Sequence, residues 1–260
     1  MKSILRYTIL TASRDWLFVG ILLLVLLATS TSIFLSSTAL VEREQMAAAY
    51  AAGINRILIV VGLTLFVCFH VRRSMDNKEV ELILSRPISR NSFVFSYFFG
   101  FALLAFLVVV PIVIFMLLLG ISGIALVDLH GLLFWAFSLY LESLIMVAIA
   151  FFASLILSSA VSSVLFCFAF YFMSRIYGFF LISIHNPYSV NKGSMISRLM
   201  EKMLEFIGIF IPRFDLLTSS EWIVYGIGEV HHVLTTFAAA GLYIPFVIAM
   251  VLYDFRRKQF

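Results

Sequence analysis

Charged residues are scarce in this sequence of 260 residues. Asp, Glu, Lys and Arg together make up 12% of the chain, whereas apolar residues make up 63% and the mean hydropathy is +1.09. An ordinary soluble domain carries about 25% charged residues. The composition therefore excludes an ordinary soluble domain and predicts an integral membrane protein.

Cysteine is also scarce, since Cys68 and Cys167 are the only two. Both lie within apolar runs, where a small apolar side chain explains them, and no structural disulfide is expected. The sequence lacks a Gly-x-x-x-x-Gly-Lys-Ser/Thr loop, the usual cradle for nucleotide phosphates. Any ATP is therefore expected to be hydrolysed by another chain, and this chain is expected to be non-catalytic and to hold no cofactor.

Long apolar runs are what the sequence does contain. A helix needs about 20 mostly apolar residues to cross the hydrocarbon core, and six runs of about that length occur. They lie near residues 16–36, 54–71, 92–119, 132–157, 160–184 and 232–253. The runs lack the period-two alternation of barrel strands. We therefore predict an all-α polytopic membrane protein with six transmembrane helices in a single domain, residues 1–260.

The positions of the basic residues predict the orientation. With a cytoplasmic N-terminus, the inner side receives eleven bases: Lys2, Arg6, Arg14, Arg72, Arg73, Lys78, Arg86, Arg90, Arg256, Arg257 and Lys258. The outer side receives six: Arg43, Arg56, Lys192, Arg198, Lys202 and Arg213. Because Lys and Arg concentrate in cytoplasmic loops, we expect a multi-pass protein of the cytoplasmic (inner) membrane with both termini inside. Bases on membrane flanks are anchors, so no nucleic-acid partner is expected.

One strongly charged segment, residues 72–90, separates the second and third spans. Asp76 or Asn77 can cap a helix of about two turns, and Pro87 ends it. The apolar face of this helix consists of Val80, Ile83 and Leu84. The segment predicts a cytoplasmic helix that either rests on the membrane or docks into a groove of a soluble partner.

The outer connections are unequal in length. Residues 37–53 and 120–131 are short loops, whereas residues 185–231 can hold structure of their own. Within the long connection Ser194 can cap a helix that runs to about Ile211. Four apolar residues recur at helical spacing: Met195, Leu199, Met203 and Phe206. We expect an outer amphipathic helix that lies at the membrane interface or packs on the outer ends of the spans.

Two ionisable residues of opposite sign, Glu142 and Arg175, lie inside predicted spans. Each is about 15 Å from the outer end of its helix at 1.5 Å per residue, so their depths match. An unpaired charge in the bilayer centre costs on the order of 3 kcal/mol. The two residues are predicted to form an intramembrane ion pair. The alternatives are a direct role lining a substrate path, or separate positions in a wet cavity.

Histidine and methionine residues on the outer side raise the possibility of copper or zinc handling. The histidines are His130, His185, His231 and His232, with Met195, Met200 and Met203 nearby in the sequence. No two of these histidines have the i, i+4 spacing that places two ligands on one helix face. We expect interfacial histidines and no metal site.

A second class of function is suggested by residues 120–123. They read Gly-Ile-Ser-Gly and match the Gly-x-Ser-Gly of rhomboid intramembrane proteases, in which a histidine on another span activates the serine. The alternative function is therefore an intramembrane serine hydrolase centred on Ser122. A simple turn with a glycine on each side explains the same four residues.

Residues 82–90 read Leu-Ile-Leu-Ser-Arg-Pro-Ile-Ser-Arg and are followed directly by an aromatic-rich run. This segment resembles the one after the second span of ABC-2 type permeases, the membrane subunits of a class of ABC exporters. The six spans, the length and the outer element are similar too. Within that family the chain looks most similar to stand-alone permeases that include the one used in nitrous-oxide reductase maturation.

The resemblance implies a permease dimer bound to two separately encoded ABC ATPase subunits. A helix at residues 76–84 would be the coupling element, and the residues expected to contact the ATPase are Asp76, Glu79, Val80, Ile83, Leu84 and Arg86. The substrate does not follow from the resemblance. A six-span structural or receptor-like subunit without transport remains a further alternative.

Overall fold

The computed structural model describes residues 16–38, 42–80, 89–185, 195–228 and 230–257. The elements named in these ranges are all helices: α2 (Trp16–Ser37), α3 (Arg43–Asp76), α5 (Arg90–Ile121), α6 (Leu129–Ile156), α7 (Ala160–His185), α8 (Met195–Phe210), the 3-10 turn η1 (Phe214–Leu216), α9 (Glu221–Tyr225) and α10 (Val230–Arg257). Six of them are long and apolar enough to cross a membrane. The prediction of an all-α polytopic membrane protein is confirmed.

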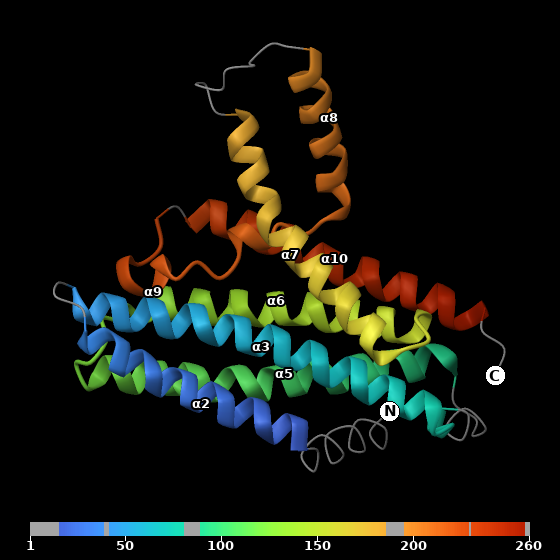
Figure 1. Ribbon diagram of the computed structural model, residues 1–260, viewed down its shortest axis with the longest axis horizontal. Coiled ribbons are helices and arrows are strands. Elements are labelled where there is room, and N and C mark those ends of the chain that lie inside the picture. Colours follow the sequence, from blue (N-terminus) through green and yellow to red (C-terminus); the bar gives the residue numbers. More distant parts are fainter. Residues whose placement is uncertain (1–15, 39–41, 81–88, 186–194, 229, 258–260) are drawn as a thin grey trace.

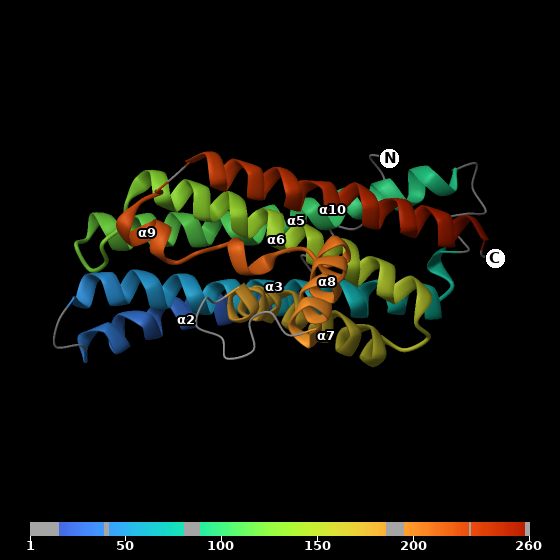
Figure 2. The same cartoon turned by 90° about the horizontal axis from the view of Figure 1, so that it is seen from above.

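Five long helices, α2, α3, α5, α6 and α10, run lengthwise in both views of the molecule (Figures 1 and 2). Helix α6 is the central one, because it packs against α3, α5, α7 and α10. Of its most apolar 18-residue window, 78% is buried, against 22–56% for the other five membrane-crossing helices. The outer helices therefore keep broad apolar faces, as expected for surfaces that contact lipid.

The bundle has two distinct ends. Toward one of them α2 begins, α3 ends, α5 begins and α10 ends (Figure 1), and we refer to it as the terminal end. There the rings of Phe93 and Phe255 stack at 5.2 Å, and Arg90 Nη1 donates to the carbonyl of Arg256 at 2.9 Å. At the opposite end Leu126 N donates to the carbonyl of Glu44 at 3.0 Å.

Helix α3 begins at Arg43 rather than near residue 54, so the predicted loop over residues 37–53 is wrong. The cause is a run of alanines, the best helix formers. Four of them, Ala47, Ala48, Ala51 and Ala52, are buried. Small side chains allow helices to approach closely. Further along α3, a Cβ on Gly62 would meet Ile21 Cγ1 of α2 at 2.8 Å.

The other five spans agree with the sequence prediction to within about one turn at each end. Two of their starts are fixed by side-chain caps. Ser89 Oγ accepts from Ser92 N at 3.2 Å at the start of α5, and Asp128 Oδ2 accepts from Gly131 N at 2.7 Å at the start of α6. Helix α5 ends at Ile121, and Gly123 has a φ of 70°, as expected for the predicted turn.

The second half of α7 and all of α8 form a hairpin that projects from one side of the bundle in Figure 1 and is seen end-on in Figure 2. Helix α8 matches the predicted amphipathic helix, and Leu199, Met203 and Phe206 are exposed on it. Tyr177 Oη donates to the carbonyl of Leu204 at 2.8 Å and thereby joins the two helices. The helix is therefore paired with α7 rather than packed flat on the ends of the spans.

Candidate functional site

The structure brings Glu142 of α6 and Arg175 of α7 together inside the bundle. Arg175 Nη1 lies 3.8 Å from Glu142 Oε1, and the glutamate side chain is fully buried. The carboxylate has two further donors. Tyr171 Oη donates to Oε1 at 2.8 Å, and Thr218 Oγ1 donates to Oε2. Both oxygens are therefore hydrogen-bonded, which offsets the desolvation of a buried charge.

Glu142, Tyr171, Arg175 and Thr218, together with Arg56, are referred to below as the buried cluster. This cluster holds the chain between η1 and α9 against the bundle. Arg175 Nη1 also donates to the carbonyls of Phe214 and, at 3.2 Å, Leu217. Thr218 N donates to Ser138 Oγ of α6 at 2.8 Å. Phe214, Leu217 and Thr218 are all buried. The loop around Thr218 is thus held against α6 and α7 by the partly buried Arg175 and the fully buried Glu142.

Thr218 has a backbone conformation that β-branched residues avoid. Its φ is 53°, in the left-handed region, and such a conformation costs on the order of 1–3 kcal/mol. All three of its polar groups are used, because its carbonyl accepts from Arg56 Nη1 at 3.0 Å in addition to the two bonds described above. The surrounding hydrogen bonds therefore hold the residue in place.

Arg56 is a member of this cluster that the sequence analysis placed in an outer position. It lies within α3, about 20 Å along the helix from Arg43 at 1.5 Å per residue. Its Nε atom is buried without a hydrogen-bond partner in the part of the chain that the structure describes. The sequence analysis expected the second span to begin near residue 54. It therefore counted Arg56 with the outer bases and not with the charges inside spans. Arg56 and Arg175 against Glu142 leave the cluster with one net positive charge.

Of the predicted coupling residues, Asp76, Glu79 and Val80 are described, and they lie at the terminal end of the bundle. Asp76 is the last residue of α3, and Asn77 closes that helix by donating its N–H to the carbonyl of Arg73. Asp76 therefore does not cap a following helix. Lys78 has a φ of 58°, so the chain turns sharply here, and Glu79 and Val80 begin a new helical turn.

This turn is fixed to the bundle. Ser74 Oγ donates to Glu79 Oε2 at 2.9 Å. Val80 is 3% exposed and belongs to the main apolar core. The predicted apolar docking face is therefore not available at Val80, because that side chain packs inward. Ile83, Leu84 and Arg86 lie outside the described residues.

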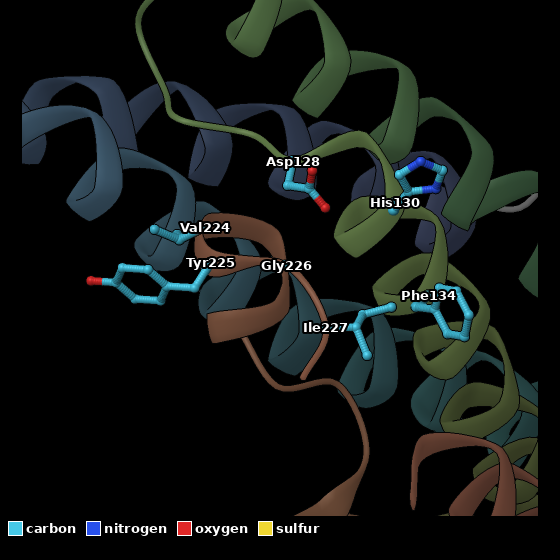
Figure 3. A pocket seen from close by; sticks show the side chains of 7 residues that line it. All are labelled: Asp128, His130, Phe134, Val224, Tyr225, Gly226 and Ile227. Atoms are coloured by element: carbon cyan, nitrogen blue, oxygen red, sulfur yellow. The ribbon is translucent and has the colours of Figure 1, made fainter. Parts of the chain in front are cut away.

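Of the histidines expected on the outer side, the side chains of His130 and His231 are described. A pocket of about 500 Å³ at the opposite end is lined by Asp128, His130 and Tyr225 among others. Figure 3 shows Tyr225 pointing away from the other two, and its hydroxyl donates to Gln45 Oε1 at 3.2 Å. Among the described residues no group of three His, Cys, Asp or Glu side chains is arranged to hold a metal ion.

Ser122 lies at the end of α5, where it is exposed. Its Oγ donates to the carbonyl of Leu119 in the preceding turn at 3.0 Å. Within the described ranges no histidine is hydrogen-bonded to it. The geometry is that of a helix end, and nothing in it favours a serine nucleophile.

No protein-family model and no curated protein matches this sequence.

Proposed function

We propose that the chain is the membrane-spanning permease subunit of an ATP-binding-cassette exporter of the ABC-2 type. It moves a substrate across the cytoplasmic membrane with energy from ATP that a separate ATPase subunit hydrolyses. A second permease copy completes the translocation unit. Both termini and the segment between α3 and α5 lie on the cytoplasmic side, as the distribution of bases favours.

The observation that carries this proposal is the anchoring of the turn after α3. The segment that resembles ABC-2 permeases begins at Leu82, two residues after Val80. Val80 is packed in the core, and Glu79 is bonded to Ser74 of α3. A force that an ATPase subunit exerts on residues 81–88 would therefore be transmitted to α3 and to α5, which begins at Arg90. A subunit without its own nucleotide loop needs such a mechanical link.

The buried cluster supplies a place where the bundle can change shape. It joins α3, α6 and α7 to the loop around Thr218 through exchangeable hydrogen bonds, beside the apolar packing of Phe214 and Leu217. In this proposal, movement of the loop frees Arg56 and Arg175 to face a passing substrate.

Photo-labelling with azido-ATP tests the proposal. The tagged chain is purified from its native membranes in mild detergent and illuminated with the reagent. We expect label on a separate co-purifying polypeptide and none on the chain itself, because the sequence has no phosphate-binding loop. Label on the chain itself would contradict the proposal, and so would a preparation in which no co-purifying polypeptide is labelled.

A further inference from the structure

A second cavity lies at the terminal end of the bundle, away from the buried cluster. It has a volume of about 380 Å³ and is lined by the start of α2, the last turns of α3 and the first residue of α7. Three basic side chains, those of His70, Arg72 and Arg73, contribute to its wall together with Asp76. Asp76 also belongs to the segment proposed to contact the ATPase, but the proposed transport function assigns no role to the other residues named here.

The charged side of the cavity has a surplus of positive charge. Arg72 Nη2 pairs with Asp76 Oδ1 at 2.9 Å, and Arg72 Nη1 donates to the carbonyl of Leu157 at 3.3 Å. The Nε atom of Arg72 is buried without a partner among the described residues. Arg73 is exposed and forms no ion pair within the described ranges. Two arginines face one aspartate, so the cavity attracts an anion.

The other side of the cavity is apolar. Leu17 of α2 and Phe69 of α3 line it, and both are more than 40% exposed. Trp16 precedes Leu17 and is 88% exposed. Tryptophan concentrates at the boundary between hydrocarbon and headgroups, so the start of α2 lies at the depth of the lipid phosphates. An amphipathic cavity at this depth suits a molecule with a charged head and an apolar tail.

We infer that this cavity binds an anionic glycerophospholipid from the leaflet at the terminal end. The phosphodiester accepts hydrogen bonds from Arg73, beside the Arg72–Asp76 pair, while the upper acyl chain lies against Leu17 and Phe69. Basic pockets between transmembrane helices are known sites for such headgroups. A free phosphate would satisfy the arginines but would leave both apolar side chains without a function. The inference requires only that the helices span a membrane, so it stands apart from the proposed ATPase coupling.

Native mass spectrometry of the full-length chain in detergent tests the site. The chain is titrated with phosphatidylglycerol and, in parallel, with phosphatidylcholine of the same acyl chains. We expect preferential binding of phosphatidylglycerol, and we expect Arg73→Gln to weaken it about tenfold, as for the loss of a hydrogen bond to a charged group. Arg73 is exposed, so this variant should fold normally.

Arg257→Gln is the matched control, because it removes one positive charge at the same end from an exposed residue outside the cavity. It should change the affinity less than about twofold, since charge alone contributes weakly at a solvated surface. Leu17→Gln should also weaken binding of the lipid.

Three results would overturn the inference. The first is equal binding of the two lipids. The second is an equal effect of Arg73→Gln and Arg257→Gln. The third is displacement of phosphatidylglycerol by glycerol 3-phosphate at the same concentration, which would show a site for free phosphate.

Discussion

At the residue scale, Glu142 carries the negative charge of the buried cluster. It is the one acid between Arg56 and Arg175, and both of its oxygens accept hydrogen bonds. Removing either arginine leaves the cluster formally neutral. Removing the glutamate leaves two partly buried guanidinium groups without a counter-charge. The three residues are therefore not equivalent, although all are charged and inside spans.

We predict that Glu142→Gln lowers the thermal stability of the detergent-solubilised chain more than Arg175→Gln or Arg56→Gln does. Breaking a buried ion pair by removing one partner costs about 3–5 kcal/mol. Glu142 is the counter-charge of both Arg175 and Arg56, so its loss affects two cations. The measurement is the loss of monodisperse protein after heating, followed by fluorescence-detected size exclusion. Glu221→Gln, at an exposed position on α9, is the control and should have little effect.

The double variant Glu142→Gln with Arg175→Gln should recover part of the loss caused by Glu142→Gln alone, since it removes one of the two stranded cations. Recovery should be incomplete because Arg175 also holds the carbonyls of Phe214 and Leu217. If the two single losses add to within about 0.5 kcal/mol, the residues do not interact.

The positions of Glu142 and Arg175 could be predicted from the sequence because depth along a helix depends only on residue count. Thr218 could not be found in this way. Its role depends on a loop that returns to the bundle after α7 and α8, and no local pattern specifies that contact. Arg56 was missed because alanines at 47–52 are ambiguous between a short apolar loop and the first turns of a long helix.

At the element scale, close contact between backbones sets how α6 and α9 meet. A Cβ on Gly131, near the start of α6, would lie 1.6 Å from the carbonyl oxygen of Trp222. The obstacle is backbone rather than a flexible side chain. The N–H of Gly131 also donates to the Asp128 cap, so the position is held from both sides. Only glycine fits there.

Gly131→Ala should therefore destabilise the chain, by an amount typical of overpacking, about 1–3 kcal/mol. Gly53→Ala is the matched comparison, because that helical glycine has nothing within 4 Å of its Cβ position. It should be neutral or stabilise by about 0.5–1 kcal/mol, since alanine is the better helix former. Thermal midpoints in the same detergent provide the comparison. Equal midpoints for the two variants would refute the close approach of α6 and α9.

The turn after α3 could be predicted from the sequence, but its exact position could not. A turn and a new helix were expected there, and Lys78 does turn the chain before Glu79. The position of the turn was misjudged, because Asp76 continues the hydrogen bonding of α3 instead of starting the next helix. Val80 is buried in the main apolar core, and the sequence alone does not specify this tertiary packing.

At the scale of the whole molecule, the six apolar helices were predictable because each is a long run with its own signal. The arrangement of the helices was not. Central burial of α6 and the projecting hairpin of α7 and α8 (Figure 1) depend on which faces meet, and most of the six long helices carry apolar residues on all sides. Periodicity carries little information where lipid and protein interior are equally apolar.

Topology can be tested with introduced cysteines in a background without Cys68 and Cys167, which are both buried. We expect a cysteine at Asn77, exposed at the terminal end, to resist a membrane-impermeant thiol reagent in intact cells. A cysteine at Glu221, exposed at the opposite end, should react. Both should react after permeabilisation. Labelling of the Asn77 variant from outside would reverse the proposed orientation.

The central claim is that residues 76–86 connect this subunit to an ATPase, and charge reversal tests it most directly. The tagged variant Arg86→Glu is compared with Lys202→Glu, an exposed reversal on α8, because Val80 is buried and would report folding instead. Both variants should reach normal membrane abundance. We predict that Arg86→Glu loses the co-purifying azido-ATP-labelled polypeptide and the associated ATP hydrolysis, while Lys202→Glu keeps both. Full retention of the labelled partner and of ATP turnover in Arg86→Glu would contradict the account.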